Sequence, residues 1–286
     1  MDNTHEILEL ARREMAQRRY QELQQSAARQ QPWLWAFLGI TATLLAGLFF
    51  LPIGSLASRL HLVVHGVCAQ AHYIAIGPYT MPLCARNTGI YAGFLATLLY
   101  LLVLGRGRAA KLPPWPITLL LAGAIIVMGI DGFNSMLLDI GGYNVYPPDN
   151  RLRVITGLGM GMAIGAFMLL MFNLSLRYNA RHDQRIIGGW AELLGAIMTA
   201  ALLYGLLFFA PAWLFYPLAI FSVVGIFGVL FIANMFVVAM VSGLEGRILH
   251  LRQLARPATF GIILTVGELV LLAGLRLWME RSLGIL

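Results

Sequence analysis

Seven long apolar stretches alternate with polar segments along the chain. They cover residues 34–53, 89–105, 116–139, 152–176, 189–209, 213–240 and 258–279. Each is close to or above the roughly 18–20 residues that a helix needs to cross a hydrocarbon core. The pattern therefore predicts an all-α polytopic membrane bundle of about seven transmembrane helices.

Composition supports this prediction. Of the 286 residues, 59% are hydrophobic and 12% are charged, whereas a soluble domain has about 25% charged residues. Residues 1–32 are polar and lack the apolar core of a cleavable signal peptide, so we expect the first span to remain as an anchor. We predict a cytoplasmic amphipathic helix within residues 1–32 and a single transmembrane domain over 33–286.

The positions of the basic residues predict the orientation. If the N-terminus lies inside, fourteen of the twenty Lys and Arg residues fall in inner segments, as cytoplasmic loops favour. The C-terminus then lies outside, and the expected location is the cytoplasmic membrane of a bacterium. The net charge of the chain is +7, and the inner positive charges are scattered over four segments, which favours contact with anionic lipids over binding of nucleic acid.

Two inner segments have loose apolar stripes. A helix over about residues 4–28 carries Leu8, Met15 and Tyr20 among charged side chains, and the loop 242–257 has the spacing of an amphipathic interfacial helix. The first helix is either solvated or interfacial, or it docks to a partner subunit. The spans over 189–279 are further candidate contact surfaces for other membrane subunits.

Polar residues gather at the outer ends of spans two, three and four. They are Arg86, Asn87, Thr88, Tyr91, Asp131, Asn134, Asn150, Arg151, Arg153 and Thr156. A carboxylate inside a membrane normally pairs with a cation, so we predict that Asp131 pairs with an arginine of this cluster. Gly157, Gly161 and Gly165 have the spacing that allows close packing of two membrane helices.

Three interpretations of this cluster remain open. It is a charge pair that fixes helix packing, a pocket for an anionic group such as a phosphate, or part of a proton or ion path that Glu192 and Glu268 extend. In the pocket, Asp131 is a candidate catalytic base or a group that orients an arginine. The sequence does not decide whether the protein is an enzyme.

Cys68 and Cys84 are the two cysteines, and both lie in the outer segment 54–88. A disulfide between them is one interpretation. A metal site that also uses His65 and His72 is another, while a catalytic thiol at Cys84 or two inert cysteines are further alternatives. The chain has no nucleotide-binding or hydrolase motif, and we predict no cofactor.

Several of these residues resemble the pattern of a family of bacterial membrane proteins, domain-of-unknown-function family 2085. The matching positions are Cys68 and Gln70; Cys84, Ala85, Arg86, Thr88, Gly89, Ile90 and Tyr91; Ile130, Asp131 and Gly132; and Asn150, Leu152, Arg153, Thr156 and Gly157. The resemblance covers about residues 60–170 and implies no activity. Asn87 and Ala69 depart from the family pattern, which has Cys and His there.

The preferred hypothesis from the sequence is that an outward-facing polar pocket recognises or processes a small anionic or lipid-headgroup ligand. One alternative is an accessory or structural subunit of a larger membrane complex. A second alternative is a proton- or ion-coupled transporter.

Overall fold

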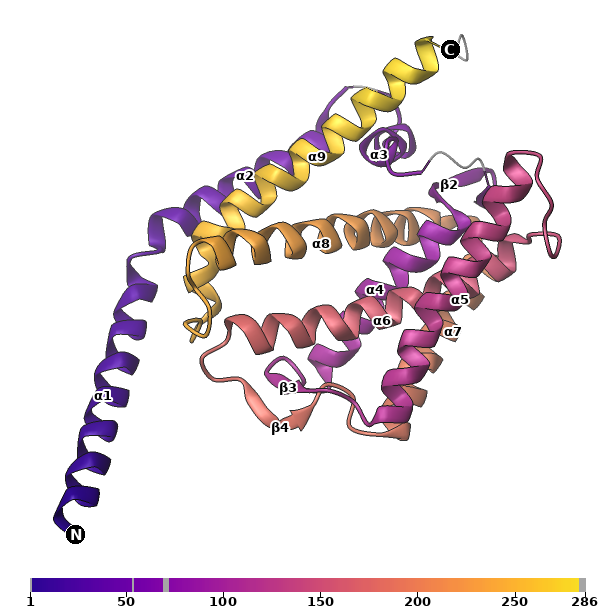
Figure 1. Ribbon diagram of the computed structural model, residues 1–286. Coiled ribbons are helices and arrows are strands. Elements are labelled where there is room, and N and C mark those ends of the chain that lie inside the picture. Colours follow the sequence, from indigo (N-terminus) through magenta and orange to yellow (C-terminus); the bar gives the residue numbers. More distant parts are fainter. Residues whose placement is uncertain (1, 53, 69–71, 283–286) are drawn as a thin grey trace.

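Long helices make up most of the computed structural model, which describes residues 2–52, 54–68 and 72–282 (Figure 1). The helices are α1 (Asp2–Ala28), α2 (Gln31–Phe50), α3 (Leu56–Val64), α4 (Ala85–Val103), α5 (Trp115–Asp139), α6 (Asn150–Leu176), α7 (Trp190–Phe209), α8 (Phe215–Val241) and α9 (Ala255–Ser282). Short 3-10 turns, η1 (Ala212–Leu214) and η2 (Leu251–Leu254), lead into the last two helices. The predicted all-α membrane bundle is confirmed.

Within the described residues, six helical segments are long and apolar enough to cross a membrane. They are α2, α5, α6, α7, Ala212–Val241 and Leu251–Ser282. The segment missing from this set is α4, which has 19 residues and begins with Ala85-Arg86-Asn87. Its polar first turn lowers its hydropathy, so a seventh span at 89–105 stays a prediction, as does the orientation of the termini.

Short strands occupy both ends of the bundle. The hairpin of β1 (Tyr73–Ile76) and β2 (Tyr79–Cys84) leads directly into α4. At the other end, β3 (Ala109–Lys111) pairs in parallel with β4 (Arg181–Arg185). We call these the hairpin end and the ribbon end; the sequence predicts that the first faces outward and the second faces the cytoplasm.

Helices α4 and α6 cross in the middle of the bundle, where glycines let their backbones touch (Figure 1). A Cβ atom on Gly157 would collide with the carbonyl oxygen of Arg86, and one on Gly165 would lie 3.0 Å from the carbonyl oxygen of Phe94. The predicted close packing along Gly157, Gly161 and Gly165 is therefore confirmed. The opposing surface of α4 is also glycine, because a Cβ on Gly89 would lie 2.6 Å from the carbonyl oxygen of Val154.

The N-terminal helix α1 projects away from the other helices at the lower left of Figure 1. The described side chains of residues 5–22 are all exposed, and Leu23 is the first buried one. The buried side chain of Gln253 holds this end of α1, donating from Nε2 to the Leu23 carbonyl and to Ser26 Oγ, both at 2.7 Å. A helix is thus present where the sequence predicts one, while its cytoplasmic location and amphipathic character stay predictions.

The prediction of an amphipathic helix over residues 242–257 is wrong. Gly243 and Gly246 adopt φ values of +67° and +58°, which break a right-handed helix. The loop instead lies along the end of α6, where the backbone N–H of Ile248 donates to the carbonyl of Leu176 at 2.9 Å. Only residues 251–254 form a 3-10 turn before α9 begins.

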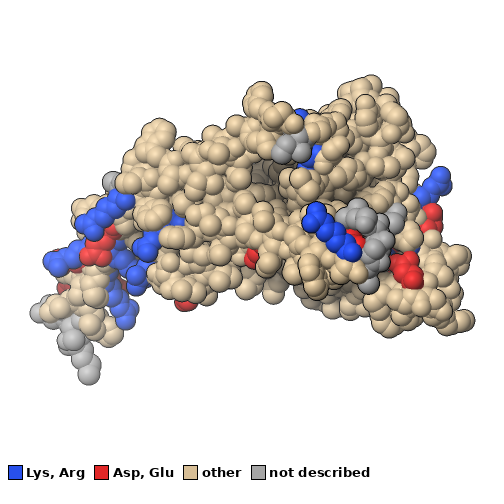
Figure 2. Space-filling model, turned by 90° about the horizontal axis from the view of Figure 1, so that it is seen from above, with Lys and Arg blue, Asp and Glu red and all other residues tan. Residues whose placement is uncertain are grey.

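Charged side chains are unevenly distributed over the surface in Figure 2. Lys and Arg gather over α1 at one end, and a smaller mixed group lies at the opposite end. Most of the face between them consists of uncharged side chains. This distribution is expected of a protein whose middle lies in lipid.

Candidate functional site

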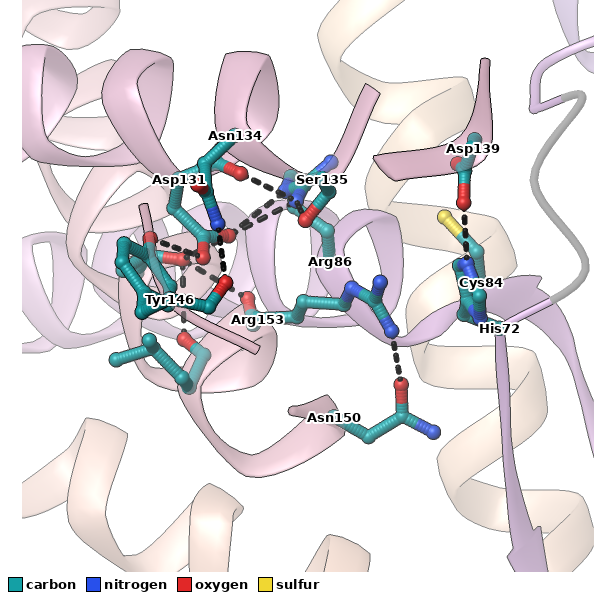
Figure 3. Close-up of polar contacts among 12 residues, drawn as sticks. His72, Cys84, Arg86, Asp131, Asn134, Ser135, Asp139, Tyr146, Asn150 and Arg153 are labelled. Atoms are coloured by element: carbon teal, nitrogen blue, oxygen red, sulfur yellow. Dashed lines mark hydrogen bonds and ion pairs between the residues drawn. The ribbon is translucent and has the colours of Figure 1, made fainter. Parts of the chain in front are cut away.

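Arg86 and Asp131 form a buried ion pair at the hairpin end. Arg86 lies in the first turn of α4 and is 8% exposed, while Asp131 lies in α5 and is 1% exposed. The Arg86 guanidinium donates to Asp131 Oδ2 from Nη2 at 2.9 Å and from Nε at 3.2 Å (Figure 3). The predicted arginine–Asp131 pair is present, and Arg86 is the partner.

Three hydroxyl groups complete the surroundings of this pair. Ser135 Oγ accepts from Arg86 Nη2 at 2.8 Å, and the Tyr146 hydroxyl donates to Asp131 Oδ1 at 2.9 Å. Thr156 Oγ1 lies 3.4 Å from Asp131 Oδ2. Burial and the bond to Asp131 raise the pKa of Tyr146. Both carboxylate oxygens therefore have partners, which come from α4, from the loop after α5 and from α6.

Asn134 fixes the loop that covers the pair. Its Nδ2 donates to the Tyr146 carbonyl at 2.9 Å, and its Oδ1 accepts from the Val145 N–H at 2.7 Å. The side-chain amide thus holds the loop in the position that brings the Tyr146 hydroxyl to Asp131. Sequence reasoning missed Tyr146, because nothing in a short polar loop indicates which of its aromatic residues turns inward.

Asn150 and Arg153 connect α6 to the hairpin. Arg153 is 4% exposed and donates from Nη1 to Asn150 Oδ1 at 2.9 Å, and Asn150 Nδ2 donates to the Tyr73 carbonyl at 3.1 Å. Arg153 Nε is buried without a hydrogen-bond partner among the described residues. The side chain of Arg151 is exposed and lies apart from this group, and its backbone N–H donates to Asp149 Oδ2 at 3.0 Å.

The remaining predicted members of the cluster have local structural contacts. Thr88 Oγ1 donates to the Leu83 carbonyl at 3.1 Å, which ties the first turn of α4 to the strand before it. Tyr91 packs against the apolar core, and Asn87 is half-buried.

The charge of Arg86 is balanced by Asp131, whereas the buried guanidinium of Arg153 donates to the uncharged Asn150. The Arg86–Asp131 pair and its partners join α4, α5 and α6, and we call this group the packing lock.

The structure argues against a direct proton path from Asp131 to Glu192. Glu192 is paired with Arg106, which follows the C-terminal end of α4, and it also accepts from the Gly188 N–H at 2.7 Å. At about 1.5 Å per residue, the 19 residues of α4 separate this pair from Arg86 by roughly 28 Å. Glu268 lies between α8 and α9 and accepts from Asn234 Nδ2 at 2.9 Å.

Cys68 and Cys84 are in direct contact, whereas the two histidines of the proposed metal set are engaged elsewhere. The Sγ atoms lie 2.8 Å apart. His65 Nε2 lies 2.9 Å from Glu280 Oε2, and His72 Nε2 lies 3.1 Å from Asp139 Oδ1. Across residues 2–52, 54–68 and 72–282, no group of three or more His, Cys, Asp or Glu side chains is placed to hold a metal ion. The described residues therefore do not support the metal alternative, and a disulfide stays a prediction.

A second polar site lies at the ribbon end, where three loops surround a cavity of about 400 Å³. Its lining consists of Leu102, Gly105, Gly107, Arg108, Arg177, Arg181, Leu249, His250 and Leu251. Burial and the nearby charge of Arg108 lower the pKa of Arg177. Sequence reasoning counted these arginines as lipid anchors, because the pairing of β3 with β4 that brings them together has no signature in the sequence.

The sequence segment that forms the hairpin end is similar to a described family. Residues 68–167 match the model of the family described as predicted membrane protein (DUF2085). The family resemblance seen in the sequence is thereby confirmed over this segment. No curated protein and no solved structure matches the chain.

The DUF2085 segment contains both cysteines and the Arg86–Asp131 pair with its surroundings, and it ends within α6. Arg177, Arg181 and His250 of the basic cavity lie beyond it. Of the residues that carry the resemblance, Gln70 lies outside the described residues, as does the departure at Ala69. The packing lock is thus a feature of the family segment, whereas the cavity depends on the rest of the chain.

Proposed function

We propose that the protein binds a small phosphate-bearing anion in the basic cavity at the ribbon end. The observation that carries this proposal is a cavity of about 400 Å³ whose lining includes Arg108, Arg177, Arg181 and His250 and no carboxylate. The location that fits is the bacterial cytoplasmic membrane with the ribbon end inside, where soluble phosphates and anionic headgroups are both available. This assigns the hypothesised anionic ligand to a different site from the one the sequence indicated.

The unbalanced charge of the cavity favours an anion. Within the part of the chain that the structure describes, Arg108, Arg177 and Arg181 form no ion pair with a carboxylate. The Nε atom of Arg177 is buried without a hydrogen-bond partner among the same residues. A phosphate would relieve the repulsion between Arg177 and Arg108 and would accept from their guanidinium forks.

Apolar side chains at the rim favour a ligand that also has an apolar part. Leu102 is 46% exposed and Leu251 is 62% exposed, and both line the cavity. A phospholipid in the adjoining leaflet could place its phosphate among the arginines while its chains remain in lipid. A free phosphate ester shares only the first of these contacts.

The test uses the full chain in nanodiscs. Native mass spectrometry measures how much phosphatidylglycerol the protein retains from a mixed phosphatidylcholine–phosphatidylglycerol membrane. Calorimetry measures binding of inorganic pyrophosphate to the protein in nanodiscs of phosphatidylcholine alone. Arg177→Gln should weaken binding about tenfold or more, which corresponds to ~1.4 kcal/mol. The charge-matched control Arg151→Gln, at the opposite end, should leave it unchanged.

The two arms separate the sources of the anion. Retention of the lipid without binding of pyrophosphate indicates a headgroup site, and binding of pyrophosphate indicates a site for soluble phosphates. If neither probe binds, or if Arg177→Gln behaves like Arg151→Gln, the proposal is wrong.

A second candidate function is that of an accessory subunit, and α1 favours it. This helix has 27 residues, and its apolar Ile7, Leu8 and Met15 are 62%, 52% and 63% exposed. Most helical stability in proteins comes from tertiary packing of an apolar face, so a partner that covers these side chains would stabilise α1. In mild detergent the native particle should then contain a second polypeptide at fixed stoichiometry, and deletion of residues 2–20 should release it. A wild-type particle that is a lone monomer would contradict this candidate.

A further inference from the structure

We infer that Cys68 and Cys84 form a thiol-oxidation site, at which an external disulfide reacts first with Cys68 and Cys84 then completes an internal disulfide. The inference is independent of anion binding, because it concerns the hairpin end. Its basis is the contact between the two Sγ atoms, which lie 2.8 Å apart although the residues are 16 positions apart in sequence. A disulfide bond is about 2.05 Å long, so the sulfurs need to approach by less than about 1 Å.

The two thiols differ in their access to solvent. Cys84 is 2% exposed at the end of β2, whereas Cys68 is only partly buried. The space around the pair is a cavity of about 20 Å³, bordered by His61, His65 and Arg276 among others. One water molecule needs about 10–15 Å³ of such space, so a bulky disulfide reagent cannot enter this cavity. The partly buried Cys68, and not the buried Cys84, is the thiol that such a reagent can reach from outside.

Ionisation also disfavours Cys84 as the thiol that reacts first. Contact with Cys68 and burial raise the pKa of Cys84 well above its ordinary value. The thiolate is the form of cysteine that attacks a disulfide. Cys84 is therefore a poor first nucleophile. Its raised pKa and its burial both assign the first step to Cys68.

The backbone around both cysteines is already fixed. The Ala85 N–H donates to the His72 carbonyl at 2.7 Å, which closes the base of the hairpin beside Cys84. The guanidinium of Arg276 on α9 donates to the carbonyl of His65 at 2.7 Å and also to that of Cys68. Forming the disulfide therefore requires little rearrangement of either segment.

The chemistry balances with one molecule of a small disulfide. The Cys68 thiolate attacks one sulfur of the reagent, so that a mixed disulfide forms at Cys68 and one reagent thiolate leaves. Cys84 then loses its proton and attacks the Cys68 sulfur, which releases the second reagent thiolate. The protein loses two electrons and two protons, and the reagent becomes two thiols.

The experiment exposes the reduced full-length protein in detergent to oxidised glutathione and follows its mass. Wild type should lose two hydrogens and retain no glutathione. Cys84→Ser should retain one glutathione on Cys68, because the resolving thiol is absent. Cys68→Ser should acquire glutathione at least about tenfold more slowly than Cys84→Ser, because Cys84 is buried.

A measurement on wild type alone guards against variants that fold poorly. Digestion without reductant should yield one linked pair of peptides, containing Cys68 and Cys84. The inference is overturned if wild type keeps two alkylatable thiols after treatment, or if folded Cys68→Ser reacts as fast as Cys84→Ser.

Discussion

Arg86 on α4 binds Asp131 on α5 across 45 positions of sequence, with Nη2 and Nε both directed at the same carboxylate oxygen. The other oxygen of Asp131 accepts from Tyr146, which lies in the loop after α5. One carboxylate thus orders the start of α4, the end of α5 and the loop between α5 and α6. This relationship explains why these charges can lie inside an apolar bundle.

Removing one member of the pair should destabilise the protein strongly. Arg86→Met leaves the carboxylate of Asp131 buried without its cation, and such a loss costs about 3–5 kcal/mol. The double variant Arg86→Met with Asp131→Leu should recover a large part of this loss, because no charge is left unpaired. Thermal unfolding in detergent measures the stability of the single and the double variant. A double variant less stable than Arg86→Met would contradict the pairing.

The contact between α4 and α6 gives a second prediction. A Cβ atom on Gly161 would collide with the Ile90 carbonyl and with the backbone of Phe94. Gly161→Ala should therefore force the two helices apart and lower the unfolding temperature by several degrees, on the order of the 1–3 kcal/mol typical of overpacking. The control Gly123→Ala adds a Cβ in open space and should have little effect. Equal unfolding temperatures for the two variants would argue against close packing.

The helices could be predicted from the sequence because their signal is local. A long apolar stretch indicates a membrane helix whatever surrounds it, and the small-residue spacing from Gly157 to Gly165 indicates a contact surface. That Asp131 needs a cation also follows from the sequence. Which arginine supplies it does not, because Arg86, Arg151 and Arg153 all lie at the same predicted end.

The features that the sequence did not reveal depend on pairing between distant segments. The strands are three to six residues long, and β3 and β4 are separated by two helices. The failed helix at 242–257 shows the same effect, since Gly243 and Gly246 turn the chain so that it can pair with the end of α6. The basic cavity exists only because these tertiary contacts bring Arg108, Arg177 and His250 together.

The thiol form should lose stability at alkaline pH. The pKa of Cys84 is raised in the folded protein above its ordinary value of 9.0, so the folded state keeps a proton that the unfolded chain releases above that pH. Stability is then fully present below about pH 9 and falls as the pH rises further, by at most ~1.4 kcal/mol per pH unit.

The comparison with oxidised protein isolates this effect. Once the disulfide has formed, neither thiol titrates, so the unfolding temperature should fall less between pH 8 and pH 10 than it does for reduced protein. The measurement is thermal unfolding at both pH values, in both redox states. Parallel decreases in the two states would show that Cys84 is not responsible.

We propose that the polar cluster at the hairpin end is a packing lock and that the anion site is the cavity at the ribbon end. The most direct measurement compares pyrophosphate affinity for two arginine variants of the full chain in nanodiscs. Arg177→Gln removes a guanidinium from the cavity, and Arg153→Gln removes a buried guanidinium from the hairpin end. We expect Arg177→Gln to lower the pyrophosphate affinity about tenfold or more, and the folded fraction of Arg153→Gln to bind within about twofold of wild type. The reverse order of the two affinities would contradict this proposal and would assign the ligand to the polar cluster at the hairpin end.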